Sequence, residues 1–328
     1  MKIALLQLEV LEKNKAANVA HGLQLVREAA ASHDLVVLPE VWTTGYSLGH
    51  LSEEAETEAS PVLAELQSIA REHSCAVLAG SVPMHHDGKI YNTSIAISKT
   101  GALVNKYDKV HLFGLFNEED FFAPGNNFQA FELDGLCCGS TICYDLRFPE
   151  LFRHLALQGA KIIFCPAEWP EARGDIWRLL AQARAAENHT FVVAVNCAGA
   201  FKGAPFYGHS MVVAPSGRIL AEAGMQEEII SCAVGTACSL GFFSADFFSS
   251  VSVTIGGTVL LSAVALSGPP TDGGVIFCGI AGFTGSVGGL TGGGVRNAPI
   301  SGFFFSSAIV IPPCFLFKTC LNLRRVSV

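Results

Sequence analysis

The chain has 328 residues, with 21 Lys and Arg against 29 Asp and Glu, and its net charge at pH 7 is −8. The first 230 residues are long enough for one sizeable α/β domain with its own core. An acidic chain without a cluster of basic residues lacks the electrostatic footprint of a nucleic-acid-binding protein, so we expect no nucleic acid partner.

The first residues, MKIALLQLEVLEKNK, are predicted to contain a strand. Their apolar run is too short for a signal peptide, and no small-residue cleavage site follows it. The six cysteines up to residue 230 show no CxxC motif and no paired spacing. We therefore expect reduced thiols in a cytoplasmic protein.

Strands and helices alternate through the rest of the first half. Apolar residues recur at helical spacing around residues 19–30 and 62–70, which predicts two helices. Strands are predicted for LVVLP and CAVLAGSV, and a hairpin for YNTSIAIS and ALVNKYDKV with its turn at Lys99-Thr100-Gly101.

The same pattern recurs in the second half. The strands LCCGSTIC, KIIFCPA and FVVAVNC alternate with the helices PELFRHLALQG and IWRLLAQARAAEN, and SMVVAP and RILAEAG form a second hairpin. Two β-α-β-α-β-β halves predict an α/β fold, a four-layer α-β-β-α sandwich with helices outside two packed sheets. The continuously apolar strands LVVLP and KIIFC are typical of sheets that are buried on both faces.

The composition changes sharply near Ser231. Residues 231–328 have no Glu, His, Trp or Tyr, but they hold 16 of the 33 glycines and five of the 11 cysteines. Their only charged residues are Asp246, Asp272, Arg296, Lys318, Arg324 and Arg325. We therefore predict one domain over residues 1–230 and an atypical apolar tail, rich in Gly, Ser and Phe, over residues 231–328.

Three chemically different side chains stand at the ends of predicted strands: Glu40 in VVLPE, Lys109 in KYDKVHLF and Cys143 in STICYDLRFPE. Strand ends are where side chains from distant segments of an α/β fold converge. Alone, each has a structural explanation, namely a capping glutamate, a solvated lysine and a buried core cysteine. Together they provide an acid/base, an oxyanion stabiliser and a nucleophile, which suffice for thiol-based hydrolysis of a carbon–nitrogen bond.

These segments resemble the signature blocks of the nitrilase superfamily of carbon–nitrogen hydrolases. The blocks are LPE, KVHLF and CYDLRFPE, and the similarity continues through PAEWP, IWRLLAQARAAEN, FVVAVNCAG and GHSMVVAPSG, over roughly residues 1–230. CYDLRFPE and PAEWP resemble most the ω-amidase branch, which hydrolyses the terminal amide of small keto-acid amides. HLFGLFNEEDFFAPGN is similar to bacterial members that act on 2-oxoglutaramate.

The resemblance implies a role for each matching residue. Glu40 would be the general base, Cys143 the nucleophile that forms a thioester, and Lys109 the oxyanion ligand beside the backbone N–H of Tyr144. The second glutamate of the family falls at Glu118 or Glu119, with the spacing from Lys109 favouring Glu118. It would hold the amide nitrogen and orient Lys109.

Two further residues are implied in substrate binding, and no metal or organic cofactor is. Trp169 would form a pocket wall, and Arg147 would bind a substrate carboxylate bidentately. The alternative for Arg147 is a structural ion pair with Glu150. The sequence contains no HExxH motif, paired CxxC motif or P-loop.

The resemblance also implies a small-molecule amide substrate and a homodimer. The similarity to the family stops near residue 230, and the arginine-rich arm that would form the dimer interface does not follow.

Three explanations of the tail compete: a shifted reading frame, which we favour, a membrane-associated tail and a disordered tail. Pro312-Pro313 and the lack of Trp and Tyr belts argue against a membrane tail, and the high hydrophobicity argues against disorder. Two functional alternatives remain open: a nitrilase or carbamoyl hydrolase, and an inactive product whose tail aggregates or associates with membranes.

Overall fold

The computed structural model describes residues 1–235 and four short strands beyond them, at residues 253–255, 258–260, 262–264 and 280–282. The chain divides into two compact units, Met1–Thr236 and Ala237–Val328. In the second unit, β15 (Val253–Ile255) pairs antiparallel with β16 (Thr258–Leu260), and β17 (Ser262–Val264) pairs antiparallel with β18 (Ile280–Gly282). The remainder of the predicted tail, with its three competing explanations, lies outside the described residues.

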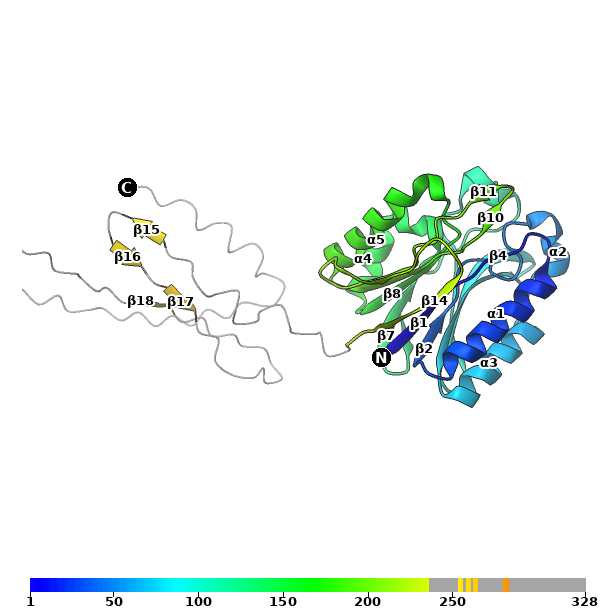
Figure 1. Ribbon diagram of the computed structural model, residues 1–328, viewed down its shortest axis with the longest axis horizontal. Helices are drawn as coiled ribbons and strands as arrows, with labels where there is room; N and C mark the ends of the chain where they lie inside the picture. Colours follow the sequence, from blue (N-terminus) through cyan, green and yellow to red (C-terminus); the bar gives the residue numbers. More distant parts are fainter. Residues whose placement is uncertain (236–252, 256–257, 261, 265–279, 283–328) are drawn as a thin grey trace, which may run out of the picture. The chain divides into compact units, whose positions relative to one another are not determined.

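The first sheet of the larger unit has six strands in the order β14-β1-β2-β3-β4-β5 (Figure 1). Its central strands β1, β2 and β3 are parallel, whereas β4, β5 and β14 join antiparallel. The strands are β1 (Lys2–Gln7), β2 (Leu35–Val37), β3 (Ala76–His86), β4 (Lys89–Ile97), β5 (Leu103–Asp108) and β14 (Glu228–Ala233).

The second sheet also has six strands, in the order β13-β12-β9-β8-β7-β6, and its centre, β7 to β9, is parallel. The strands are β6 (Phe131–Leu133), β7 (Leu136–Ser140), β8 (Ile162–Pro166), β9 (Phe191–Val195), β12 (Met211–Val213) and β13 (Ile219–Glu222). A small hairpin of β10 (Ala200–Phe201) and β11 (Ala204–Pro205) lies outside both sheets.

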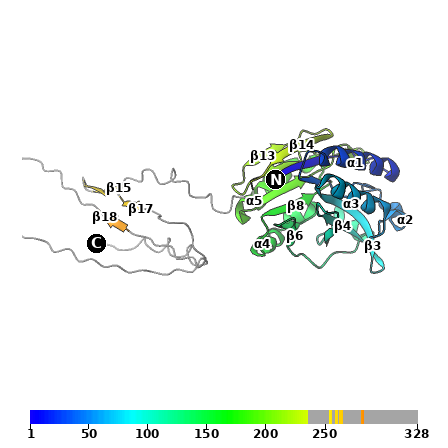
Figure 2. The same cartoon turned by 90° about the horizontal axis from the view of Figure 1, so that it is seen from below.

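Helices cover the outer face of each sheet. Helices α1 (Lys15–Ala30) and α3 (Pro61–His73) pack on the first sheet, and α4 (Pro149–Leu157) and α5 (Gly174–Asn188) pack on the second. Figures 1 and 2 show the two helix pairs on opposite sides of the sheets. The short helix α2 (Leu51–Glu54) and five 3-10 turns complete the unit: Leu48–His50, Gly114–Phe116, Glu118–Asp120, Cys143–Arg147 and Glu171–Arg173.

The inner faces of the two sheets form a separate hydrophobic core. Ile3 and Val37 of the first sheet belong to the same buried cluster as Phe164 and Val193 of the second. Each sheet is therefore buried on both faces, which requires continuously apolar central strands. The predicted four-layer α-β-β-α sandwich is confirmed.

The strand β14 was not predicted, and it crosses the predicted boundary at residue 230. It pairs with β1 in the register Lys2↔Ala233, and the backbone N–H of Val234 donates to the carbonyl of Met1. The first unit therefore ends several residues later than predicted. The sequence signal was weak because β14 is an edge strand whose residues are largely exposed, and its sequence EIISCA shows no regular alternation of apolar and polar residues.

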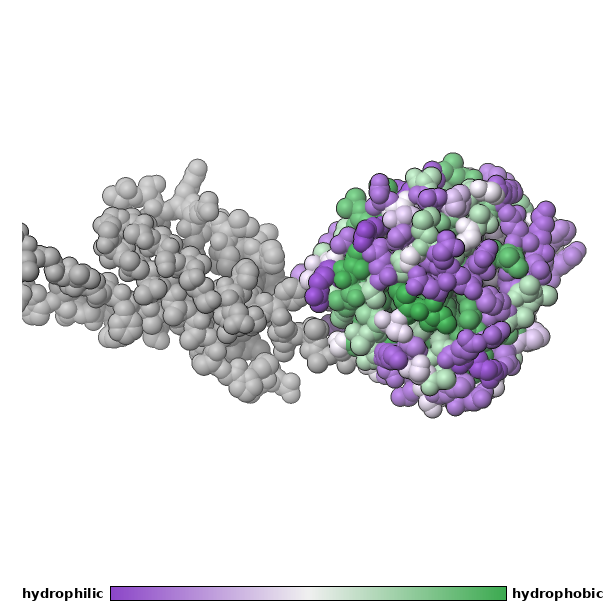
Figure 3. All heavy atoms as spheres, in the orientation of Figure 1, coloured by the Kyte–Doolittle hydropathy of each residue, from purple (hydrophilic) through white to green (hydrophobic). Residues whose placement is uncertain are grey.

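Polar residues cover most of the visible face of the larger unit, and hydrophobic residues gather near β1 and β14 (Figure 3). Ile229 of β14 is one of the exposed large hydrophobic residues. Among the residues that the structure describes, no helix is long and apolar enough to cross a membrane.

Candidate active site

The three strand-end residues meet inside the molecule. Glu40 follows β2, Lys109 follows β5, and Cys143 begins a 3-10 turn after β7. Glu40 and Lys109 are fully buried, and Cys143 is 5% exposed. The Nζ atom of Lys109 lies 2.8 Å from Oε1 of Glu40, and the charges of both residues act on the Cys143 thiol. The ends of strands in two different sheets thus deliver the three groups to one place.

The Glu40 carboxylate is held by donors on both of its oxygens. Oε1 accepts from Nδ2 of Asn92 at 2.8 Å and from the hydroxyl of Tyr46 at 3.0 Å, in addition to Lys109. Oε2 accepts from the backbone N–H of Glu168 at 2.9 Å. Several hydrogen bonds to a buried carboxylate fix its position and satisfy its charge.

Glu118 rather than Glu119 lies at this site, because Glu118 is buried and Glu119 is exposed. Oε1 of Glu118 accepts from Nζ of Lys109 at 2.8 Å and also contacts the hydroxyl of Tyr46. Oε2 accepts from the backbone N–H of Phe113 at 2.7 Å. Both oxygens are therefore occupied. This geometry fits the implied task of orienting Lys109, and the implied contact of Glu118 with an amide nitrogen stays a prediction.

Lys109 remains a cation in spite of its burial. Burial alone would lower the pKa of its ammonium group, but the carboxylates of Glu118 and then Glu40 outweigh it and raise the pKa well above its usual value. A buried ammonium that stays charged is suited to stabilise a negative oxygen that forms beside it.

The backbone at Cys143 presents its thiol in an unusual way. Its φ angle is 45°, in the left-handed region that residues other than glycine seldom adopt. Since Cys143 starts the 3-10 turn Cys143–Arg147, the backbone N–H of Tyr144 lies in the first turn, where such groups have no partner within the helix. A thiol and a free backbone donor therefore adjoin each other, as nucleophilic attack on a carbonyl requires.

Cys143 is a thiol at neutral pH. Burial and then the charge of Glu40 raise its pKa well above the ordinary value, and the ammonium of Lys109 only partly opposes them. A nucleophile of this kind needs a base to remove its proton as it attacks. Glu40 is the buried carboxylate whose charge acts most strongly on the thiol.

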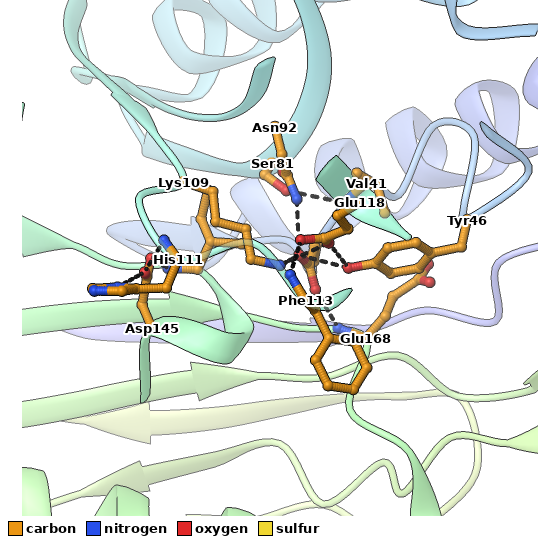
Figure 4. Close-up of polar contacts among 12 residues, drawn as sticks. Val41, Tyr46, Ser81, Asn92, Lys109, His111, Phe113, Glu118, Asp145 and Glu168 are labelled. Carbon is orange, nitrogen blue, oxygen red and sulfur yellow. Dashed lines mark hydrogen bonds and ion pairs between the residues drawn. The ribbon is translucent and has the colours of Figure 1, made fainter. Parts of the chain in front are cut away.

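Asp145 holds the turn that contains Cys143, and the sequence analysis missed it. Its Oδ2 accepts from the backbone N–H of Ile142 at 2.9 Å and from the hydroxyl of Tyr107 at 2.6 Å. Its Oδ1 accepts from the backbone N–H of His111 at 3.0 Å and lies 2.7 Å from the Nδ1 atom of that residue (Figure 4). The carboxylate thereby ties the nucleophile turn to the segment after Lys109.

Cys143 lines a narrow pocket, with a cavity volume of about 10 Å³, that also contains the predicted substrate-binding residues. The lining residues are Phe113, Cys143, Tyr144, Arg147, Glu168, Trp169, Pro170 and Arg173.

Arg147 stacks on aromatic rings in this pocket. Its guanidinium carbon lies 5.7 Å from the ring centre of Tyr144 and 5.4 Å from that of Trp169. Arg173, which the sequence analysis did not select, lies 5.7 Å from the ring centre of Phe113. Within residues 1–235 neither arginine forms an ion pair, so the alternative of an Arg147–Glu150 pair is not observed.

Glu168 is a second residue of the pocket that the sequence analysis missed. It is 1% exposed, and its Oε2 atom has no hydrogen-bond partner. Burial, and next the charge of Glu40, raise its pKa well above the usual value. The signal was present in the sequence, because Glu168 follows the apolar strand KIIFCPA just as Glu40 follows LVVLP.

This raised pKa predicts a dependence of stability on pH. Above the unfolded pKa of about 4.3, the unfolded chain releases the Glu168 proton while the folded protein keeps it, so folding loses free energy as pH rises. Glu168→Gln removes this loss of up to about 1.4 kcal/mol per pH unit. In urea unfolding, the variant should therefore gain stability relative to the parent as the pH rises above the unfolded pKa. A constant difference, or one of opposite sign, would contradict the raised pKa.

Among the residues that the structure describes, no group of three or more His, Cys, Asp or Glu side chains has the arrangement of a metal site. The reactive groups of the candidate active site are a thiol, carboxylates, an ammonium group and backbone N–H donors.

Comparison with known proteins places these features in a family context. The model of the carbon–nitrogen hydrolase family matches residues 2–236. The 2-oxoglutaramate amidase of Bacillus subtilis is 38% identical over 228 residues, which are 70% of this chain and 88% of that protein. The human omega-amidase NIT2 is 34% identical over 239 residues, covering 70% of this chain and 86% of the relative.

Solved structures show the same fold. Nit3 of Saccharomyces cerevisiae, a member of branch 10 of the nitrilase superfamily, matches with a TM-score of 0.66 and 34% identity, over 71% of this chain and 89% of its own. An amidase variant from Nesterenkonia sp. AN1, with acrylamide added to its active-site cysteine, matches with a TM-score of 0.66 and 25% identity, over 72% of this chain and 93% of its own.

Proposed function

We propose that this chain, which belongs to the carbon–nitrogen hydrolase family, hydrolyses the terminal amide of a small keto-acid amide such as 2-oxoglutaramate to the acid and ammonia. One observation supports the proposal most directly. The Cys143 thiol and the unpaired guanidinium of Arg147 line the same small pocket. A linear substrate with an amide at one end and a carboxylate at the other matches this pair of groups.

In the first half of the proposed reaction, the Cys143 sulfur attacks the amide carbon as Glu40 takes the thiol proton. The amide oxygen becomes an oxyanion, which Lys109 and the backbone N–H of Tyr144 stabilise. The carbon–nitrogen bond then breaks, Glu40 returns the proton to the nitrogen, and ammonia leaves. A thioester to Cys143 remains.

In the second half, water attacks the thioester as Glu40 takes one of its protons. The carbon–sulfur bond breaks, the thiolate recovers the proton, and the free acid leaves. The burial of Lys109 between Glu40 and Glu118 suits both halves, because its charge and position persist without solvent. Glu118 is a positioning residue in this scheme, since both of its oxygens bind other protein groups.

Arg147 is proposed to bind the substrate carboxylate, with Arg173 beside it. Arg147→Met should raise the KM for 2-oxoglutaramate by about 10- to 100-fold, because a hydrogen bond to a charged group contributes about 1.5–3 kcal/mol. Butanamide, which lacks the carboxylate, should be hydrolysed equally by parent and variant. Steady-state ammonia release measures both, and Arg153→Met, at an exposed arginine of α4, is the matched control.

An equal loss on both substrates would show that Arg147 supports the pocket structure instead of the carboxylate. The same assay also tests the alternatives within the superfamily. A higher kcat/KM of the unaltered chain for a nitrile or an N-carbamoyl compound than for 2-oxoglutaramate would contradict the proposed substrate class.

A further inference from the structure

Glu168 presents a buried carboxyl oxygen with no protein partner. Its backbone N–H donates to Oε2 of Glu40 at 2.9 Å, which fixes the main chain beside the proposed base. Its Oε1 atom lies 3.7 Å from Sγ of Cys197, whereas Oε2 has no hydrogen-bond partner. Glu168 lines the pocket together with Cys143. Leaving a buried carboxyl oxygen unpaired is unfavourable, so a group that binds in the pocket is the natural partner.

In the carboxyl groups of Glu40 and Glu118, by contrast, each oxygen accepts at least one hydrogen bond from the protein. Oε1 of Glu40 accepts from three protein donors and Oε2 from one. Both oxygens of Glu118 are also engaged. A primary amide brings two N–H donors into the pocket, and each needs an acceptor when it is removed from water. Glu168 is the carboxyl group of the pocket that still has an acceptor to offer.

We infer that Glu168 binds the –NH2 group of the reacting amide through Oε2 and thereby makes the site selective for primary amides. This inference rests on the proposed function, and it assigns to Glu168 the contact with the amide nitrogen that the family resemblance gave to Glu118. Glu40 then remains available for proton transfer while the leaving nitrogen is already held.

The protonation state of Glu168 agrees with this role. Its raised pKa, caused by burial and then by the charge of Glu40, favours the neutral carboxyl over the carboxylate. A neutral carboxyl has one accepting oxygen and one hydroxyl. With the proton on Oε1, the Cys197 thiol can donate instead to the backbone carbonyl of Glu40, 3.9 Å away, and Oε2 is free to accept from the amide. No third negative charge is then added beside Glu40 and Glu118.

The test measures binding without turnover, in the Cys143→Ala background. Calorimetry compares 2-oxoglutaramate with the methyl ketone in which –CH3 replaces its –NH2. The parent should bind the amide about tenfold more tightly than the ketone. Glu168→Met should abolish most of that preference by weakening the amide alone. Glu171→Met, at an exposed glutamate of the same segment, should leave both affinities unchanged.

Thermal melting separates a binding role of Glu168 from a structural role. If Glu168 stabilised the fold, its replacement would lower the Tm. Because Glu168→Met removes a buried, unpaired polar group, its Tm should equal or exceed that of the parent. Glu168→Ala provides the same binding comparison if the thioether disturbs packing. The inference is wrong if the amide preference persists in these variants, or if both affinities fall by the same factor. If the parent binds neither compound, the proposed function itself fails.

Discussion

Replacing Cys143 with alanine is expected to abolish ammonia release from 2-oxoglutaramate, with a fall in kcat of at least about 10⁴-fold. Within residues 1–235, the thiol lines the pocket, and the charges of the Glu40 carboxylate and the Lys109 ammonium both act on it. Without it no thioester forms, and water would have to attack the amide directly. The melting temperature should change little, because Cys143→Ala removes a single sulfur atom that borders an existing pocket.

Cys138→Ala is the matched control for this prediction. Cys138 is also buried and free, but it lies in the core between the two sheets. Its variant should keep the parent kcat and KM. Near-normal turnover in Cys143→Ala, or a similar loss in both variants, would refute the assignment of the nucleophile.

Replacing Glu40 with glutamine is expected to reduce kcat by about 10³-fold or more. A general base typically contributes about 10²- to 10⁴-fold, and here the same group acts in both halves of the reaction. The substitution keeps the size of the side chain, but the amide cannot accept a proton. Stopped-flow measurement should therefore find slow acylation as well as slow deacylation, with no burst of ammonia.

Glu119→Gln is the control for this second prediction, because Glu119 is exposed and adjoins a glutamate of the site. Its activity should stay within about twofold of the parent, as for most surface substitutions. If Glu40→Gln kept the parent kcat and changed KM alone, Glu40 would be a binding residue and not the base.

The sequence sufficed for the layered fold because its signals are local. Continuously apolar strands such as LVVLP, and helices with apolar residues at regular spacing, determine which faces are buried. The placement of Glu40, Lys109 and Cys143 together followed from one rule, namely that strand ends of an α/β fold converge. The structure brings these three groups together, while their catalytic roles stay predictions that the variants above test.

The supporting contacts could not be predicted because they join distant segments. Tyr46 contacts Glu118 across 72 positions, and Asn92 donates to Glu40 across 52. No local pattern marks such residues before the fold is known. Glu168 is different, since its position after an apolar strand was visible in the sequence, and applying the strand-end rule to every carboxylate would have selected it.

The apolar composition of the chain beyond residue 235 is known from the sequence. The larger unit, Met1–Thr236, contains every residue of the proposed chemistry. We therefore expect the catalytic constants to depend on this unit.

The most direct test of the account is to trap the intermediate. The chain is mixed with 2-oxoglutaramate, quenched in acid within one turnover and digested for mass spectrometry. The account predicts an acyl group on the peptide that contains Cys143, lost on treatment with hydroxylamine and absent from Cys143→Ala. Release of ammonia without acylation of Cys143, or acylation of another residue, would contradict it.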